Sequence, residues 1–202
     1  MKRAFQSFGA IATEPKFVSG GPTAVLTTSF DKSPLALFTK PPHCYLHVQA
    51  DFLGQAMAGT VPSLKPVEDI NFFPFPAANA GQTPAVETSG EMLAALKDTP
   101  QTQAFMRYVS SPAFNTLVAG TGQWIAANRK TPLSAYTAPL SKHAASVYAS
   151  ATTVRYTAQN SMPLPMSQAF LKAVLAYVKH PADLDAQLAR LDKVRTTAYA
   201  TN

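Results

Sequence analysis

Residues 120–136 read GTGQWIAANRKTPLSAY, and this stretch holds Trp124, the single tryptophan among 202 residues. A Gly-Thr-Gly turn comes before the indole, and glycine frees the backbone for conformations that other residues avoid. Such a turn can direct a large side chain out of the helix that precedes it. An exposed indole suits a ligand with an apolar face and a polar rim, such as a sugar ring. The alternative is that Trp124 lies in the hydrophobic core.

The composition is that of a folded chain with a real core, long enough for one or two domains. Hydrophobic residues make up 47% of the chain and charged residues 14%, which excludes an intrinsically disordered protein. The net charge of +6 and the isoelectric point near 9.5 raise the possibility of nucleic-acid binding. The basic residues are scattered, however, with no run longer than Lys2-Arg3 or Arg129-Lys130. Nucleic-acid binders concentrate such charge on a stripe or motif, so we expect no nucleic-acid partner.

Three further features bear on the environment of the chain. Cys44 is the single cysteine, so no internal disulfide is possible. No apolar run reaches the length of a membrane span. The N-terminal MKRAFQSFGAIATEPKF has a basic start but no sustained apolar core or small-residue cleavage site, so we predict no signal peptide in this chain.

Proline and glycine divide the chain into short segments, most of them with helical periodicity. Thr99-Pro100 and Ser111-Pro112 are good helix starts, because a hydroxyl cap precedes a proline whose missing N–H costs nothing in the first turn. Asp51 is a candidate cap for the helix that follows it. Helices are predicted over 3–13, 23–30, 34–38, 52–59, 99–110, 111–119, 139–150, 167–179 and 182–198. Strands are predicted over 44–49 (CYLHVQ) and 70–75 (INFFPF), a short extended piece over 153–156, and a loop over 77–84.

The last predicted helix has a single apolar face. Leu184, Leu188 and Leu191 recur along it at helical spacing. We expect the last two helices to bury such faces against the 3–13 helix and the strand around Tyr45–Val48.

Residue types that carry catalysis or bind metals do not form a recognisable set. His43 and His47 would share one face of a strand while Cys44 points to the other. No nearby carboxylate or second cysteine completes a tetrahedral set, so a structural role is favoured. The chain has no Gly-x-Ser-x-Gly elbow, no phosphate-binding glycine loop and no Gly-x-Gly-x-x-Gly. We predict no catalytic residue, no metal and no cofactor.

Binding residues are better placed, since several polar and aromatic side chains stand at the ends of predicted elements. Phe52 follows the first predicted strand, and Glu91 stands where a loop joins a helix, at a predicted helix N-terminus. Gln123 and Trp124 follow the glycine turn, and Arg155 lies in the short extended segment. Each also has a structural interpretation: Glu91 as a helix-terminal charge, and Arg155 as a solvated edge residue.

Several segments, taken in order, resemble a known family. They are FFPFP at 72–76, SGEM at 89–92, LKDTPQTQAFMRYVSSPAFNTLVAGTGQWIAANRKTPLSAY at 96–136, TVRY at 153–156, SMP at 161–163 and DLDAQLARLDKVRTTAY at 183–199. This order resembles the carbohydrate-binding proteins of bacterial ABC importers, and more narrowly the solute-binding family that includes maltose- and α-glucoside-binding proteins. The resemblance covers nearly the whole chain, and the ordered set of segments makes it specific.

The resemblance implies a helix-rich α/β fold, as a partial periplasmic-binding-protein-like (type 2) bilobal structure that lacks most of its first lobe. Residues 1–76 would then form part of the second lobe, 77–136 part of the first lobe, and 137–202 a helical return to the second. The chain matches only the later half of the family's sequence, which implies a fragment or a partner that supplies the rest.

The family's function implies two lobes that close on a sugar or oligosaccharide outside the cytoplasm and deliver it to the ABC permease subunits in the membrane. By position, the ligand contacts would be Phe52, Glu91, Gln123, Trp124 and Arg155. We expect Trp124 to open onto the same concave surface as Phe52 and Glu91.

Departures from the family pattern put the identity of the sugar in doubt. The family often has aspartate where this chain has Glu91. It often has Arg-Phe-Asp where this chain has Arg155-Tyr156-Thr157, and tryptophan where Leu171 follows Phe170.

Two other classes of function remain as alternatives. One is a truncated lobe that acts as an interaction or structural protein, and the other is a glycan hydrolase, which is disfavoured because no carboxylate pair is placed for it.

Overall fold

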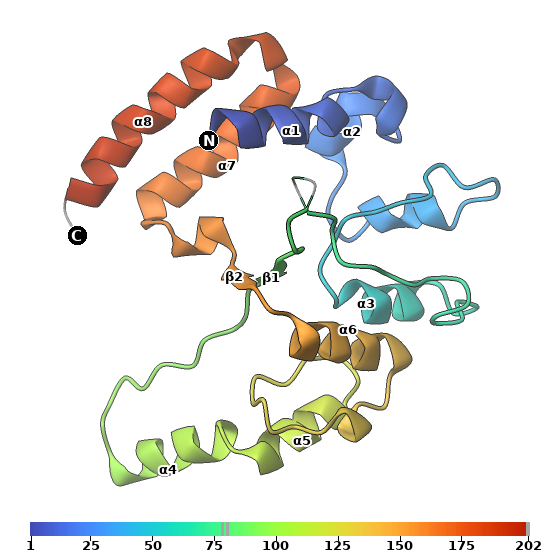
Figure 1. Cartoon of the computed structure of the whole chain (residues 1–202), viewed down its shortest axis with the longest axis vertical. Helices are drawn as coiled ribbons and strands as arrows, with labels where there is room; N and C mark the ends of the chain where they lie inside the picture. Colours follow the sequence, from blue (N-terminus) through green and yellow to red (C-terminus); the bar gives the residue numbers. More distant parts are fainter. Residues whose placement is uncertain (78, 80, 201–202) are drawn as a thin grey trace. The chain divides into compact units, whose positions relative to one another are not determined.

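The regular structure is mostly helical. The computed structural model describes residues 1–77, 79 and 81–200, and its ribbon is shown in Figure 1. Short 3-10 turns link the helices, and the helix-rich character predicted from the sequence is confirmed. The bounds are α1 (Lys2–Ala12), α2 (Gly21–Thr27), α3 (Leu53–Thr60), β1 (Val86–Thr88), α4 (Pro100–Val109), α5 (Pro112–Gly120), α6 (Pro139–Ser150), β2 (Val154–Tyr156), α7 (Leu164–Lys179) and α8 (Leu184–Ala200).

The chain divides into two compact units. Unit 1 comprises Met1–Val48 and Tyr156–Asn202, and unit 2 comprises Gln49–Arg155. The lobe boundaries expected from the family, after residues 76 and 136, remain a prediction. All five candidate ligand contacts fall within unit 2.

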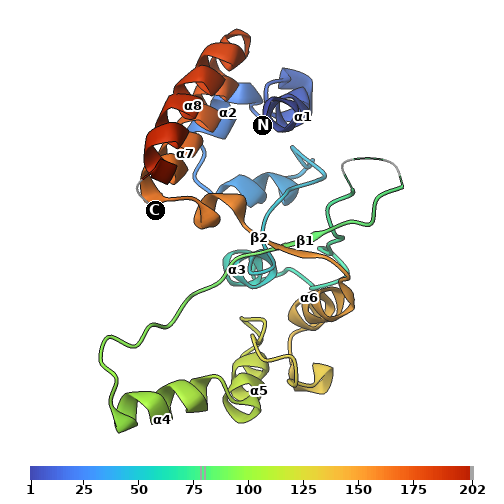
Figure 2. The ribbon, with the colours of Figure 1, turned by 60° about the vertical axis from the view of Figure 1, so that its left-hand side comes forward.

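The core of unit 1 is built by α1, α7 and α8. Figures 1 and 2 both show α7 and α8 side by side. The Phe5 ring of α1 meets Phe170 and Tyr177 of α7 edge-on, with centroids 5.9 and 5.6 Å apart. Leu184 and Leu191 of α8 are buried in the same cluster. The apolar face predicted for the last helix, and its packing on the first, are therefore confirmed.

Helix α1 comes very close to α7 at Gly9. A methyl group on this residue would stand 2.7 Å from Cε1 and Cζ of Tyr177. Gly9 recurs one turn after Phe5 and is likewise buried. Only the absence of a side chain at Gly9 permits this approach, because protein interiors leave no spare volume for an added group.

Two strand predictions are wrong. Residues 44–49 form no strand, and Tyr45 and Val48 are 81% and 73% exposed. They therefore do not cover the last two helices. Residues 70–75 likewise form no named strand, and Ile70 makes only an isolated bridge to Pro66. Both segments have strand composition, but a strand also needs a hydrogen-bonding neighbour, and proline cannot donate to one.

The segment around Phe72 instead packs against α6 in unit 2. The Phe72 ring stacks on His143, with centroids 4.4 Å apart. The Asn71 side-chain oxygen lies 3.3 Å from Nδ1 of the same histidine. The predicted loop over 77–84 lies partly outside the described residues. No helix in the described part of the chain is long and apolar enough to cross a membrane.

The helix starts in the middle of unit 2 follow the local signals. Thr99 Oγ1 accepts the N–H of Thr102 at the start of α4, and Ser111 Oγ accepts the N–H of Phe114 at the start of α5. The prediction that Asp51 caps α3 is wrong. The residue at the cap position is Phe52, and no side-chain hydrogen bond closes that end.

Candidate functional site

Trp124 is displayed at the surface of unit 2. It lies in the loop between α5 and α6, and 55% of its surface is exposed. The prediction that the glycine turn directs the indole outward is confirmed, and the alternative that Trp124 belongs to the core is wrong. Gln123 beside it is also exposed, and its N–H donates to Thr121 Oγ1 at 3.3 Å. The two side chains are thus presented together.

The start of this loop is held by a buried glycine turn. Gly122 has φ +73°, and a Cβ placed on it would stand 2.9 Å from that of Ala138. Its carbonyl accepts a buried hydrogen bond from Ser141 Oγ in α6. Just before it, the Gly120 carbonyl accepts from Thr137 Oγ1 at 3.0 Å. Only glycine meets both the left-handed conformation and the lack of space.

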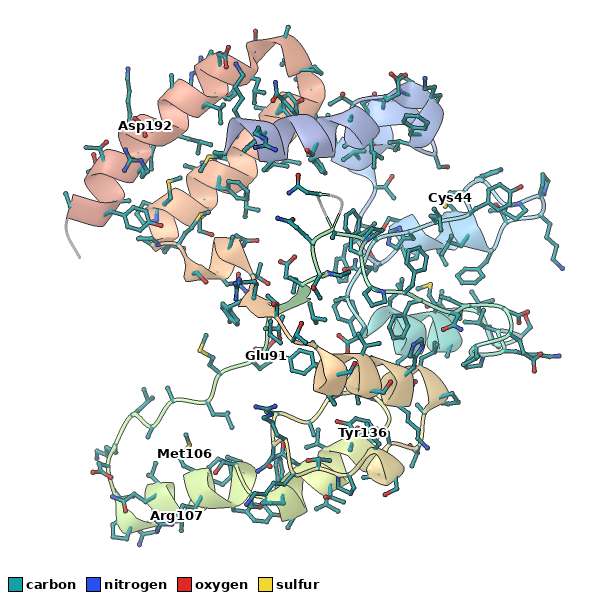
Figure 3. All side chains as sticks on the ribbon, viewed as in Figure 1. Cys44, Glu91, Met106, Arg107, Tyr136 and Asp192 are labelled. Carbon is teal, nitrogen blue, oxygen red and sulfur yellow. The ribbon has the colours of Figure 1, made fainter. Side chains whose placement is uncertain are left out.

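A second attachment holds the loop directly after the indole. The N–H of Ala126 donates to the hydroxyl oxygen of Tyr136 at 3.0 Å. The Tyr136 ring is buried in a small cluster with Ala119 and Ala145, against which Ile125 packs. Figure 3 labels Tyr136 in this part of the structure. The Gln123-Trp124 pair therefore lies between two attached points, Gly122 and Ala126.

A third attachment joins the loop to the junction of α4 and α5. The buried side chain of Asn115 accepts the N–H of Asn128 at 3.2 Å and donates to the carbonyls of Val109 and Ser111, each at 3.0 Å. The Asn128 amide in turn donates to the Ser110 carbonyl at 2.7 Å. The first part of the loop, from Gly122 to Asn128, is thus attached at three points.

Phe52 is connected to this loop through the first turn of α6. A Cβ on Gly54, two residues after Phe52, would stand 2.6 Å from Leu140 Cδ1, so α3 and α6 are in close contact there. The next residue of α6, Ser141, holds the glycine turn two residues before Trp124. Adjacent residues of one helix therefore support the elements that carry both aromatic candidates. Phe52 itself is 38% exposed.

Glu91 and Arg155 lie near the strand pair instead. Strand β1 pairs with β2, and the Val86 N–H donates to the Thr153 carbonyl at 3.0 Å. Arg155 is an exposed residue of β2, and Glu91 follows β1 by three residues. Figure 3 shows Glu91 on the segment that leaves β1. In the described part of the chain, Glu91 and Arg155 form no ion pair with each other.

The helix N-terminus expected at Glu91 is absent. Residues 91–95 have no regular structure, and the next helix begins only at Pro100. Apolar side chains follow the carboxylate, but Met92 and Leu93 are 78% and 62% exposed. An amphipathic segment becomes a stable helix mainly when its apolar face is buried, and here that face has no cover. Glu91 is therefore a solvent-exposed side chain on a segment without regular structure.

Burial shifts the pKa of other ionisable groups in both units. Desolvation raises the pKa of the Asp51 carboxyl, next to Phe52, against the lowering effect of backbone hydrogen bonds from Asp51 and Phe52. In unit 1, desolvation raises the pKa of Cys44 and lowers that of His47. The described residues contain no group of three histidine, cysteine or acidic side chains that could hold a metal ion.

Sequence reasoning missed the residues that brace the loop. Asn115, Tyr136 and Ser141 each bond to backbone far away in sequence, so local patterns do not reveal them. One signal was present. Asn115 is a lone amide among the apolar residues of α5, four positions after the Ser111 cap. A buried amide among apolar residues needs partners, which points to a loop packed on that face.

An indole held at the surface by a braced loop suits a protein that binds a ring-shaped ligand without reacting with it. Comparison with known proteins finds relatives of this chain that are solute-binding proteins. The resemblance to the carbohydrate-binding proteins of bacterial ABC importers is thereby confirmed.

Two relatives carry this result. The chain is 30% identical over 163 residues, 81% of its length, to the osmoprotective compounds-binding protein GgtB of Synechocystis sp.. It is 31% identical over 163 residues, 79% of its length, to the alpha-glucosides-binding periplasmic protein AglE of Rhizobium meliloti. It spans 38% and 35% of the lengths of these relatives. No protein-family model matches the chain, and no solved structure matches it significantly.

Proposed function

We propose that this chain acts in the substrate-binding component of a carbohydrate ABC transport system and binds a sugar without catalysis. The observation that carries the proposal is the exposed indole of Trp124 on a loop attached at Gly122 and Ala126. An apolar ring of this size is exposed at a cost unless a ligand covers it. A sugar ring supplies the complementary apolar face, and its hydroxyls supply the polar rim.

Each of the five residues has a role that follows from its chemistry. Trp124 and Phe52 stack on faces of the sugar. Glu91 accepts hydrogen bonds from hydroxyls, Arg155 donates to them, and Gln123 does both. Bonds to the two charged groups are the stronger ones. Because Glu91 and Arg155 are exposed, closure around the ligand must exclude water from both side chains. Their hydrogen bonds to the sugar become stronger only in that environment of lower dielectric.

The proposed partners are a sugar or oligosaccharide and the permease subunits of an importer, with the protein outside the cytoplasm. The relative AglE is named a periplasmic protein that binds alpha-glucosides, and this supports both the location and the ligand class. In this proposal residues 1–76 and 137–202 contribute to one lobe and 77–136 to the other, as the family resemblance implies.

A titration tests the proposal. Maltose and other α-glucosides are added while the emission of Trp124 is recorded, and calorimetry measures the heat in parallel. A stacked sugar should shift the emission to shorter wavelength, because it removes water from the indole. Glu91→Gln should weaken binding, while the control Glu68→Gln, an exposed residue paired with Lys65 in the same unit, should not. Unchanged emission and no heat at millimolar sugar would rule out sugar binding by this chain.

One observation favours a second candidate, an interaction or structural protein without sugar binding. Leu96 is 97% exposed, and Met92 and Leu93 precede it on the same uncovered segment. Contiguous exposed apolar side chains mark surfaces that another protein covers. A chain that fails the sugar titration but forms a defined oligomer would support this candidate.

A further inference from the structure

The junction between α4 and α5 is bonded by two asparagines. Three successive carbonyls, those of Val109, Ser110 and Ser111, accept hydrogen bonds from the side-chain amides of Asn115 and Asn128. The last carbonyls of a helix lack partners within it, so the end of α4 offers acceptors that a neighbouring loop can use. The loop that carries Trp124 uses them through Asn128.

Asn115 uses its full set of donors in this arrangement. Its amide nitrogen has two hydrogens, and they go to Val109 and Ser111, while its oxygen accepts the N–H of Asn128. Only 5% of the residue is exposed. An isosteric replacement cannot preserve all three bonds, because only a primary amide offers two donors and an acceptor on a side chain of this length.

We propose that Asn115, together with Asn128, is a positioning residue that presets the geometry of the Gln123-Trp124 pair for its ligand. This inference rests on the proposed function. Gly122 and Ala126 are held by α6 and Tyr136, and the Asn115–Asn128 bond holds the segment just after Ala126 against α5. A loop fixed before the ligand arrives has no ordering entropy to lose on binding, which raises affinity without any new contact.

The test uses the fact that Trp124 is the single tryptophan, so its signals report this loop alone. Asn115→Asp keeps the shape and the acceptor for Asn128, but it loses both donors. Asn128→Ala keeps its backbone N–H and loses two side-chain bonds, the one to the Ser110 carbonyl and the one from the Lys130 N–H. Asn160→Ala, an exposed asparagine of unit 1, is the control. The readouts are the near-ultraviolet circular dichroism of the indole and its fluorescence anisotropy, both without sugar.

We expect the tryptophan circular-dichroism band to be lost in Asn115→Asp and weakened in Asn128→Ala, with a matching drop in anisotropy well below the melting temperature. Asn160→Ala should leave both unchanged. If Asn115→Asp does not fold, Asn128→Ala decides alone, since its side chain is only half buried. Variants that keep the band and merely melt earlier would show that the two asparagines serve only stability and would overturn the inference.

A second measurement separates this inference from the proposed function. If the unaltered chain binds sugar, each variant should bind it about tenfold more weakly. A tenfold loss of affinity corresponds to the net free energy of about one hydrogen bond. If the unaltered chain binds no sugar, the proposed function fails. The ligand-free spectra then still decide whether Asn115 orders the loop.

Discussion

The close approach of α1 to α7 gives a sharp test of the packing in unit 1. Gly9→Ala adds one methyl group that would lie 2.7 Å from two ring carbons of Tyr177. Carbon atoms in contact prefer roughly 3.5 Å, so the ring or the helix must move by about 1 Å. Such overpacking costs about 1–3 kcal/mol, whereas alanine gains about 1 kcal/mol over glycine in a helix. We expect a net loss of up to about 2 kcal/mol in the free energy of unfolding.

A second glycine supplies the matched control. Gly59 is also helical, near the end of α3, and a Cβ there meets nothing within 4 Å. Gly59→Ala should therefore raise the free energy of unfolding by up to about 1 kcal/mol. The same substitution is thus predicted to act with opposite sign at the two positions, and urea unfolding followed by far-ultraviolet circular dichroism measures both.

A double mutant traces the loss to its cause. Tyr177→Phe removes the hydroxyl that an alanine at position 9 would meet first, so the penalty of Gly9→Ala should shrink in that background. Neighbouring sites that share a contact couple by about 0.5 kcal/mol or more. If Gly9→Ala gains as much stability as Gly59→Ala, or if its penalty is the same in the Tyr177→Phe background, the close contact of α1 with α7 is refuted.

Three further predictions follow from burial, charge and exposure. Leu191 is only 3% exposed, so Leu191→Asp should unfold unit 1 by burying a charge at a cost above about 3 kcal/mol, and Leu188→Asp should destabilise the unit less. The control Ala189→Asp, on the exposed face of α8, should melt at the normal temperature. A normal melting temperature for Leu191→Asp would refute the docking of α8. Desolvation holds the pKa of His47 below its ordinary 6.5, so the unfolded chain takes up the proton first and stability should fall as the pH falls through 6.5. His47→Gln should remove this slope, and an unchanged slope would contradict the prediction. The exposed Met92 and Leu96 should make the chain self-associate or bind dyes that report apolar surface; light scattering that shows a monomer, without dye binding, would exclude this.

Local signals in the sequence were sufficient for the starts of α4 and α5 and for the exposure of Trp124. The Thr99 and Ser111 starts depend on a cap and a proline within one turn, so neighbouring residues determine them. The outward indole likewise depends on the glycine turn directly before it. These predictions needed no knowledge of distant contacts.

Features that depend on distant partners were not predictable in the same way. The strands expected at 44–49 and 70–75 have the right composition, but strand pairing is decided by a neighbour elsewhere in the chain. The helix expected at Glu91 failed because nothing covers its apolar face. Asn115 was missed because its role is visible only through Asn128, thirteen residues later. The residues that support the candidate site are therefore harder to predict from the sequence than the residues that would contact the ligand.

The attached loop has a consequence for how ligand choice can change over time. Gly122 and Ala126 are held through backbone atoms, so the side chains of Gln123 and Trp124 contribute little to folding. Mutations at these two positions are therefore nearly free of a stability penalty, and selection can act on them for recognition alone. Substitutions at these two positions can therefore change which small molecule is bound while the fold of the protein stays the same.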